Sequence, residues 1–279
     1  MDDYMKSIVS HFRKDGRTPD QLRPVSISRG VYDFAAGSVL LEMGKTKVLC
    51  AVSIQNGVPP FLRGKGTGWL TAEYALLPMS TITRTQRDAS LGRKDGRSVE
   101  IARFIGRCFR SIIDLSQFGE KTITIDCDVL QADGGTRTAS ITGAFLALLM
   151  AQEKWLNAHL ISKPIVKEKI TAVSVGVVSG NTLLDLNYDE DSTASADFNF
   201  VITDSDKIIE IQGGAESSSL SWDTFDDVRA AARDGAQKLF ALYDQFDVTE
   251  PESKFNKQHL ERVERAPLFS LKNRQNSSH

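Results

Sequence analysis

The sequence predicts an α+β fold built from two related halves, because strand and helix signals alternate along the chain. Strands, a helix, a strand and a second helix come first, and then strands and a helix follow again. A chain of 279 residues with 41% hydrophobic content can bury a sizeable core as a single domain. Only RKDGR recurs residue by residue, at 13–17 and 93–97, and we interpret this pair as a coincidence.

Hydrophobic spacing predicts the elements of the first half. Residues 37–54 hold two β-rich runs around a turn at Gly44 and Lys45, and residues 122–130 alternate as a further strand. Between them, apolar side chains recur at helical spacing from 98 to 112, with arginines on the opposite face. Residues 138–157 are apolar nearly all round, which predicts a buried helix.

The second half predicts more strands, with turns at 179–181 and 204–206, and then a helix from about Trp222 to Phe246. Beyond Phe246 the chain is charged and poor in aliphatic residues, which is typical of a flexible tail. We therefore expect an N-terminal extension at 1–12, one domain at 13–247 and a tail at 248–279.

Composition indicates a cytoplasmic protein with no membrane attachment. A net charge of −2 gives no overall attraction to nucleic acid, so any polyanion site must be a local patch. The three cysteines are odd in number and lie in apolar segments, which predicts reduced core thiols. No signal-peptide core is found, and the longest apolar run, 144–151, is too short to span a bilayer.

The stretch QADGGTRTAS, 131–140, is the strongest candidate for a binding site. Gly134, Gly135, Thr136 and Arg137 offer backbone N–H groups, a hydroxyl and a guanidinium at a helix start, which favours an anion. The lysine of a P-loop and the third glycine of a dinucleotide turn are both missing, so the anion need not belong to a nucleotide. A tight turn with an N-capping threonine is the structural alternative.

Charged residues suggest two further features. A basic excess runs from Arg84 to Arg110, and it either binds phosphodiesters or forms a solvated helix face; Arg97 differs because it follows a glycine at a helix start. Acidic residues gather in 185–197, where two carboxylates could hold a divalent ion or simply form a polar turn. These acids are Asp185, Asp189, Glu190, Asp191 and Asp197.

The four histidines lie outside the patterned motifs, at 11, 159, 259 and 279. Catalysis by a serine or cysteine with a histidine base is therefore disfavoured. The residues alone predict phosphate-dependent chemistry on nucleic acid, or binding of nucleic acid without reaction.

Six motifs, in this order and spacing, closely resemble the ribonuclease PH family, and they cover about residues 13–247. The motifs are RKDGRTPDQLRPV, GKTKVLCAVS, PPFLRGKGTGWLTAEYALLP, GRSVEIARFIGR, DCDVLQADGGTRTASITGAFLAL and LDLNYDEDSTASADFN. The resemblance implies a ribonuclease PH-like fold of two related βα halves. It also implies a phosphorolytic 3′-to-5′ exoribonuclease and nucleotidyltransferase that trims tRNA 3′ ends and releases nucleoside diphosphates.

The resemblance assigns roles to residues of this sequence. Inorganic phosphate, the co-substrate, would be bound by Arg97, Gly135, Thr136 and Arg137. Asp191 and Asp197 would hold Mg²⁺ and act with Arg137 in catalysis, and one of the two aspartates would protonate the leaving oxygen. RNA binding would fall to Arg63, Lys65, Arg84 and Arg87.

The resemblance further implies a homohexamer, a trimer of dimers, that acts on tRNA precursors and other RNA 3′ ends. Met79 stands where we expect the family to carry an arginine that helps seat tRNA. A catalytically silent RNA-binding ring subunit, and a structural module of the same fold, are the alternatives. The silent subunit predicts the loss of one or more of the implied catalytic residues, and none is lost. The structural module would require no phosphate dependence at all.

Overall fold

The computed structural model describes residues 13–87, 90, 92–93, 95–217 and 219–246. All of them belong to one compact unit, Met1–Thr249. The second unit, Glu250–His279, lies outside the described residues, as do the expected extension at 1–12 and tail at 248–279.

The first half forms a five-stranded sheet in the order β1-β2-β3-β5-β4. Neighbouring strands are antiparallel except for β4 and β5, which are parallel. The turn between β2 and β3 places Gly44 at a positive φ of 58°, which explains the glycine there. The strands are β1 (Val25–Arg29), β2 (Gly37–Met43), β3 (Thr46–Asn56), β4 (Trp69–Leu76) and β5 (Lys121–Gln131).

The second half forms a four-stranded antiparallel sheet in the order β7-β6-β8-β9. Its central strand β6 is buried along almost its whole length, as expected for a strand covered on both faces. The strands are β6 (Ile170–Val178), β7 (Asn181–Leu184), β8 (Ala196–Thr203) and β9 (Ile208–Ala215).

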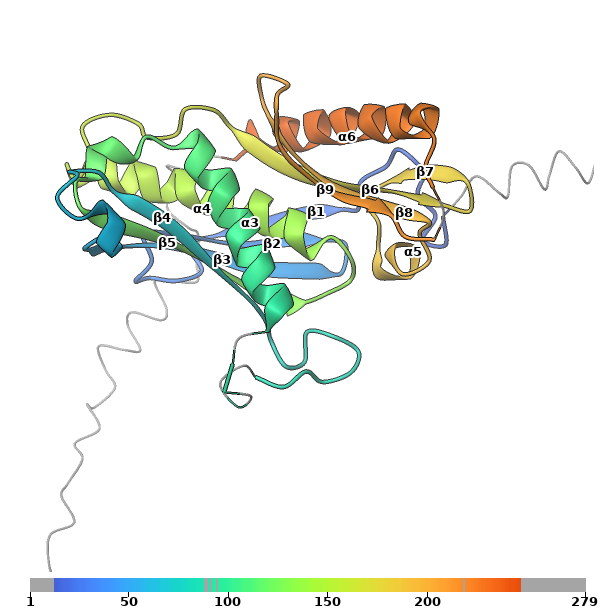
Figure 1. The fold of residues 1–279 in the computed structure, drawn as a ribbon, viewed down its shortest axis with the longest axis horizontal. Coiled ribbons are helices and arrows are strands. Elements are labelled where there is room, and N and C mark those ends of the chain that lie inside the picture. Colours follow the sequence, from blue (N-terminus) through green and yellow to red (C-terminus); the bar gives the residue numbers. More distant parts are fainter. Residues whose placement is uncertain (1–12, 88–89, 91, 94, 218, 247–279) are drawn as a thin grey trace, which may run out of the picture. The chain divides into compact units, whose positions relative to one another are not determined.

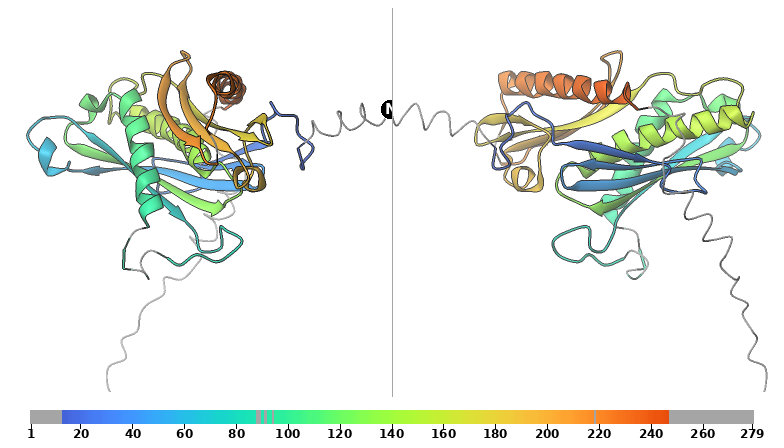
Figure 2. Two further views of the ribbon diagram at one scale, coloured as in Figure 1. Left: turned by 45° about the vertical axis from the view of Figure 1, so that its right-hand side comes forward. Right: turned by 180° about the vertical axis from the view of Figure 1, so that it is seen from behind.

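The helices form the remaining layers. Helix α4 lies between the two sheets and packs against β2 and β3 on one side and β6 on the other, while α6 covers the outer face of β6 (Figures 1 and 2). Helix α3 packs against β4. The helices are α3 (Gly96–Ile112), α4 (Thr136–Asn157), the single turn α5 (Tyr188–Asp191) and α6 (Trp222–Tyr243), with short 3₁₀ turns η1 (Pro60–Leu62) and η2 (Leu115–Phe118).

Glycines let α4 approach the first sheet closely. A Cβ atom on Gly37 of β2 would lie 2.1 Å from the Ala147 carbonyl oxygen of α4. A Cβ atom on Gly143 would lie 2.9 Å from the Cys50 sulfur of β3. The central helix is therefore held at a distance that only glycine permits at these two positions.

The predicted α+β architecture with two related halves is confirmed, and so is the buried helix near 138–157, which begins at Thr136. All three cysteines are free and buried, as predicted. The sequence patterns did not predict β1, β4 or α5, and α6 ends at Tyr243 rather than Phe246. Among the described helices, none is both long and apolar enough to cross a membrane.

The substitution Gly37→Ala should lower the free energy of unfolding by about 2 kcal/mol, because its methyl group must push the α4 backbone off β2. Urea denaturation measures this. Gly96→Ala is the control, because a Cβ atom there meets nothing within 4 Å. Equal stability of the two variants would show that α4 can move away without cost.

Candidate active site

The turn between β5 and α4 presents an open helix N-terminus. Gly134 and Gly135 both adopt left-handed conformations, with φ of 76° and 63°. Gly135 is the N-cap of α4, and no side chain caps the helix. The alternative with an N-capping threonine is therefore wrong, and the first N–H groups of this 22-residue helix stay available to an anion.

The same turn lies against the second half of the molecule. A Cβ atom on Gly134 would lie 2.5 Å from the carbonyl oxygen of Leu186, just before α5. Any side chain at Gly134 would therefore separate the turn from α5. This close approach brings the start of α5 next to the start of α4, and Asp191, at the other end of that single turn, feels the charges of Arg97 and Arg137.

Tyr74 of β4 fixes the first residue of α4. Its hydroxyl lies 2.8 Å from Thr136 Oγ1, and both side chains are buried. Burial raises the pKa of Tyr74, and the Thr136 hydrogen bond and the charges of Arg97 and Arg137 oppose that rise. Both guanidinium groups therefore act on the Tyr74 hydroxyl, beside the start of α4.

The two arginines reach this point from different helices. Arg97 is exposed in the first turn of α3, whose N-cap Asp95 accepts a hydrogen bond from the Ser98 N–H. Arg137 of α4 pairs with Glu100 at 3.1 Å and donates to Gln212 Oε1 at 2.9 Å. Helix α3 thus supplies one arginine directly and orients the other through Glu100.

Asp191 and Asp197 form the acidic side of the site. Desolvation by surrounding protein atoms raises the pKa of Asp191, and Arg97 and Arg137 partly oppose the rise. Desolvation also raises the pKa of Asp197, with the charges of Asp191 and Glu216 adding to it. The two carboxylates therefore lie within electrostatic range of each other and of the arginines.

The other acids of 185–197 have structural roles. Asp185 pairs with Arg23 at 2.6 Å, and Glu190 pairs with Arg13; both acids are buried. Asp189 is exposed and lies 3.7 Å from Lys14. Among the described residues, no three acidic, histidine or cysteine side chains come together as a cluster that could hold a metal ion.

The four expected RNA-binding residues lie in two groups at opposite ends of β4. Arg63 and Lys65 follow η1 and precede the strand, whereas Arg84 and Arg87 follow it. All four are exposed. The strand between the two groups is eight residues long, or about 25 Å.

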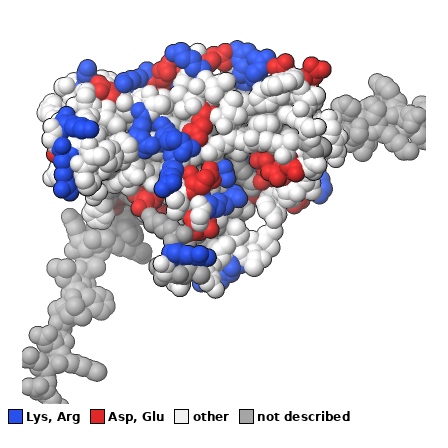
Figure 3. All heavy atoms as spheres, in the orientation of Figure 1, with Lys and Arg blue, Asp and Glu red and all other residues white. Residues whose placement is uncertain are grey.

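The arginines farther along α3 form part of a mixed surface. Arg107 pairs with Glu210 of β9, and Arg110 lies over the Trp69 ring, 4.6 Å from its centroid. Figure 3 shows acidic side chains interspersed with basic ones on the face that presents α3. This part of the basic run therefore fits the solvated helix face better than a phosphodiester site.

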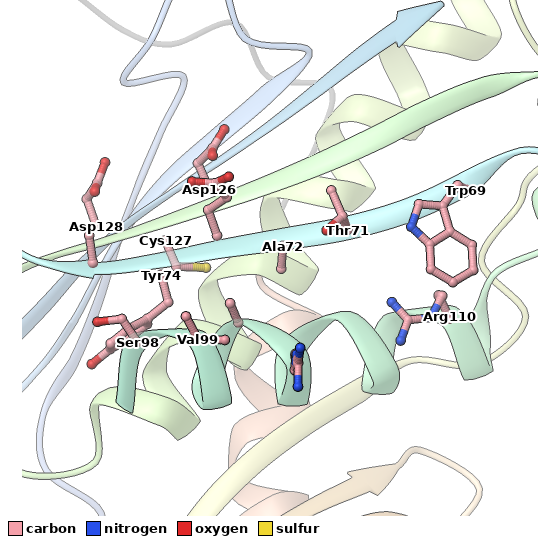
Figure 4. Close-up of a pocket in the computed structure, with 14 residues that line it drawn as sticks. Trp69, Thr71, Ala72, Tyr74, Ser98, Val99, Arg110, Asp126, Cys127 and Asp128 are labelled. Carbon is pink, nitrogen blue, oxygen red and sulfur yellow. The ribbon is translucent and has the colours of Figure 1, made fainter. Parts of the chain in front are cut away.

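A cavity of about 630 Å³ lies between α3 and the edge strand β4. Figure 4 shows Asp126 and Asp128 on the far side of the strands from Ser98 and Val99, with Trp69 and Arg110 at one end. Burial raises the pKa of Asp126, and the charges of Glu73 and Asp128 add to the rise. The lining combines acids with Arg103 and Arg110, and it includes none of the expected phosphate-binding residues, so the cavity is distinct from the site at α4.

Sequence reasoning missed four residues that contact or influence the site: Tyr74, Glu100, Gln212 and Glu216. Of these four, only Glu216 could have been placed near the site from the sequence pattern. Folding 196–215 as a hairpin about the predicted turn at 204–206 pairs Asp197 with Gly214 and brings Glu216 opposite Ser195.

Comparison with known proteins shows two family matches. The profile of the first domain of the 3′ exoribonuclease family matches residues 21–153, and that of the second domain matches residues 170–235. A protein named ribonuclease PH from Dehalococcoides mccartyi strain 195 is 52% identical over 86% of this chain and 99% of its own length. Its counterpart in strain CBDB1 is 50% identical over the same shares.

Solved structures show the same fold. An Archaeoglobus fulgidus exosome chain, from a structure with RNA bound to the active site, is 25% identical with a TM-score of 0.72, over 86% of this chain and 96% of its own. Rrp46 from rice is 21% identical with a TM-score of 0.67, over 82% of this chain and 97% of its own.

Asp126→Asn should raise the free energy of unfolding by about 0.5 kcal/mol at pH 7, because this half-buried carboxylate is desolvated and is also repelled by neighbouring acids. Since its pKa is raised in the folded state, the carboxyl costs stability as the pH rises above about 4. The gain should shrink as the pH falls towards the ordinary aspartate pKa. Urea denaturation at pH 7 and at about pH 4 tests this, with the exposed Asp33→Asn as the control. A gain in stability that does not depend on pH would contradict the prediction.

Proposed function

The chain belongs to the ribonuclease PH family of phosphorolytic 3′-to-5′ exoribonucleases, and we propose that it trims tRNA precursors at the site described above. In this reaction inorganic phosphate is the co-substrate and nucleoside diphosphates are released, while the reverse reaction adds nucleotides. The family resemblance inferred from the six sequence motifs is confirmed by relatives of at least 50% identity.

The open start of α4 beside Arg97 and Arg137 is the observation that carries the site assignment. An oxygen of the bound phosphate attacks the phosphorus of the last phosphodiester, and the 3′ oxygen of the preceding nucleotide leaves. Phosphate is already anionic at neutral pH, so it needs positioning and charge neutralisation more than a base. The described histidine, His159, lies beyond the far end of α4, about 33 Å away along the helix.

Asp191 and Asp197 fit a Mg²⁺ ion that shares its ligands with phosphate groups. Mg²⁺ commonly takes one or two carboxylates together with substrate phosphates, which agrees with a carboxylate pair rather than a larger cluster among the described residues. When bound, the ion would neutralise charge on the scissile phosphate. The protein itself would hold the two carboxylates near Arg97 and Arg137 without forming an ion pair between them, so that the carboxylates stay available to the metal ion.

RNA binding is assigned in this proposal to Arg63, Lys65, Arg84 and Arg87, through the RNA backbone. Because the two groups lie in loops beyond opposite ends of β4, a ring of six copies would bring several such groups around one tRNA. The likeness to an archaeal exosome core structure, at 25% identity and a TM-score of 0.66, supports an assembly of several subunits. Met79 is exposed on the loop between β4 and α3 and reduces the basic character of that loop.

The same proposal places the catalytic domain at 13–247 and the protein in the cytoplasm. Three free, buried cysteines support a reducing compartment. Residues 13–76 contribute the segment 13–23 and four of the five strands of the first sheet, β1 to β4, so the domain needs this N-terminal part to form that sheet.

The test of the function is to incubate the purified protein with Mg²⁺ and a tRNA that carries a short 3′ extension, with and without phosphate. Shortening that depends on phosphate and yields nucleoside diphosphates is the expected result. RNA binding without shortening would instead indicate a silent ring subunit, and Met79→Arg would then be the first variant to make.

In this assay, Arg137→Ala should lower the rate at least about a hundredfold, because a charge-assisted contact to the attacking phosphate is lost. The assembly should remain intact by light scattering. Arg233→Ala, which removes an exposed arginine paired with Asp206, is the matched control and should keep full activity. An active Arg137→Ala enzyme would refute the site.

Asp191→Asn should lower kcat about a hundredfold while the phosphate KM changes little, because the carboxylate serves the metal ion rather than the phosphate. The rate should also need more Mg²⁺ to saturate. Asp189→Asn, in the same helix turn but beside Lys14 instead of the two arginines, should behave like the wild type. Loss of phosphate affinity alone would contradict the role of a metal ligand.

A further inference from the structure

Arg23 is a buried arginine that the reaction does not use directly. Its side chain is 3% exposed, and Asp185 holds it through Nη2 at 2.6 Å and Nε at 3.0 Å. The remaining nitrogen, Nη1, points at the turn before α4 and donates to the Asp133 carbonyl at 2.6 Å. The guanidinium of Arg23 therefore contacts the turn that forms the proposed phosphate site.

Thr46 of β3 completes this contact. Its hydroxyl donates to the Gly134 carbonyl at 2.7 Å and accepts from the Asp133 N–H at 3.1 Å and from Arg23 Nη1 at 3.2 Å. The residue is fully buried. One hydroxyl thus uses its hydrogen and both lone pairs, and two of its three partners belong to the turn.

Peptide geometry converts these contacts into a constraint on the anion site. In a planar trans peptide the C=O of one residue and the N–H of the next point in opposite directions. Since the Gly134 carbonyl points inward to Thr46, the Gly135 N–H points outward, away from β3. Within the described part of the chain, the Gly135 N–H has no backbone acceptor.

We infer that Thr46 and Arg23 are positioning residues for phosphate binding, acting through the backbone of the Asp133–Gly135 turn. They hold two carbonyls on the protein side, so that the Gly135 N–H and the start of α4 face the anion. This inference rests on the proposed function, because it names what orients the donors of that same site. Neither residue needs to touch phosphate itself.

Thr46→Val is the sharpest test, because it keeps the shape of the side chain and removes only the hydroxyl. Phosphate affinity should fall about tenfold, the equivalent of one net hydrogen bond, in a calorimetric titration with inorganic phosphate. The phosphate KM should rise by the same factor, while kcat at saturating phosphate and the RNA KM change less than about twofold. Thr46→Ser restores the hydroxyl and should bind phosphate within about twofold of the wild type.

Thr122→Val is the matched control. Thr122 is also a buried threonine of the first sheet, and its hydroxyl donates to the Gly57 carbonyl at 2.7 Å, away from the turn. It should lose comparable stability without losing phosphate affinity. A general loosening of the sheet would affect both variants alike.

The inference is overturned if Thr46→Val binds phosphate like the wild type, or if Thr122→Val weakens binding equally. Either result, with an active wild-type enzyme, leaves the proposed function standing. A wild-type protein that releases no nucleoside diphosphates and binds no phosphate would overturn both together.

Discussion

The Asp185 carboxylate is the group on which the site depends. It is 1% exposed and accepts from the backbone N–H, Nε and Nη2 of Arg23, so its charge is balanced inside the protein. Such a buried pair adds little net stability, yet removing one partner costs about 3–5 kcal/mol because the other charge stays buried. Arg13 and Arg17 donate to the Asp185 carbonyl, which ties the N-terminal segment to the second half. The turn before α4, which Arg23 contacts, is thereby fixed to both halves.

The position of α4 explains why the proposed site lies at the junction of the two halves. Sheets on both sides bury its apolar surface, so only its two ends can carry polar function. The N-terminal end has unpaired N–H groups and the positive end of the helix dipole, and it is the end next to α5. The proposed anion site at the junction thus follows from placing a long apolar helix between two sheets, with the carboxylates supplied by α5 and β8 of the second half.

The spacing of apolar residues and the turn residues predicted the elements that depend on local sequence alone. The helix at 98–112, the buried helix and the hairpin around Gly44 follow from spacing and turn residues, and each is present. Strand β4 was not predicted, although burial alternates along it from Trp69 to Tyr74, because its Ala72 and Glu73 are residue types with low strand propensity. The uses of Asp185 and Glu190 could not be inferred from the acidic cluster, since their partners lie about 160 residues or more away. Residues recognised by family motifs, such as Arg97 and Arg137, did come together, because those motifs encode long-range pairing that composition does not.

The acids of 185–197 show how one short segment serves both stability and chemistry. Asp185 and Glu190 face arginines of the N-terminal segment and are neutralised in the interior. Asp191 and Asp197 form no ion pair within the described residues, and desolvation and mutual repulsion raise the pKa of Asp197. Arg137, meanwhile, is held by Glu100 and Gln212 through Nη1 and Nη2, and its Nε has no acceptor among the described residues. Unpaired carboxylates beside arginines cost stability in the folded protein. Under the proposed function, a metal ion on the acids and a phosphate on the arginines would each relieve part of that cost.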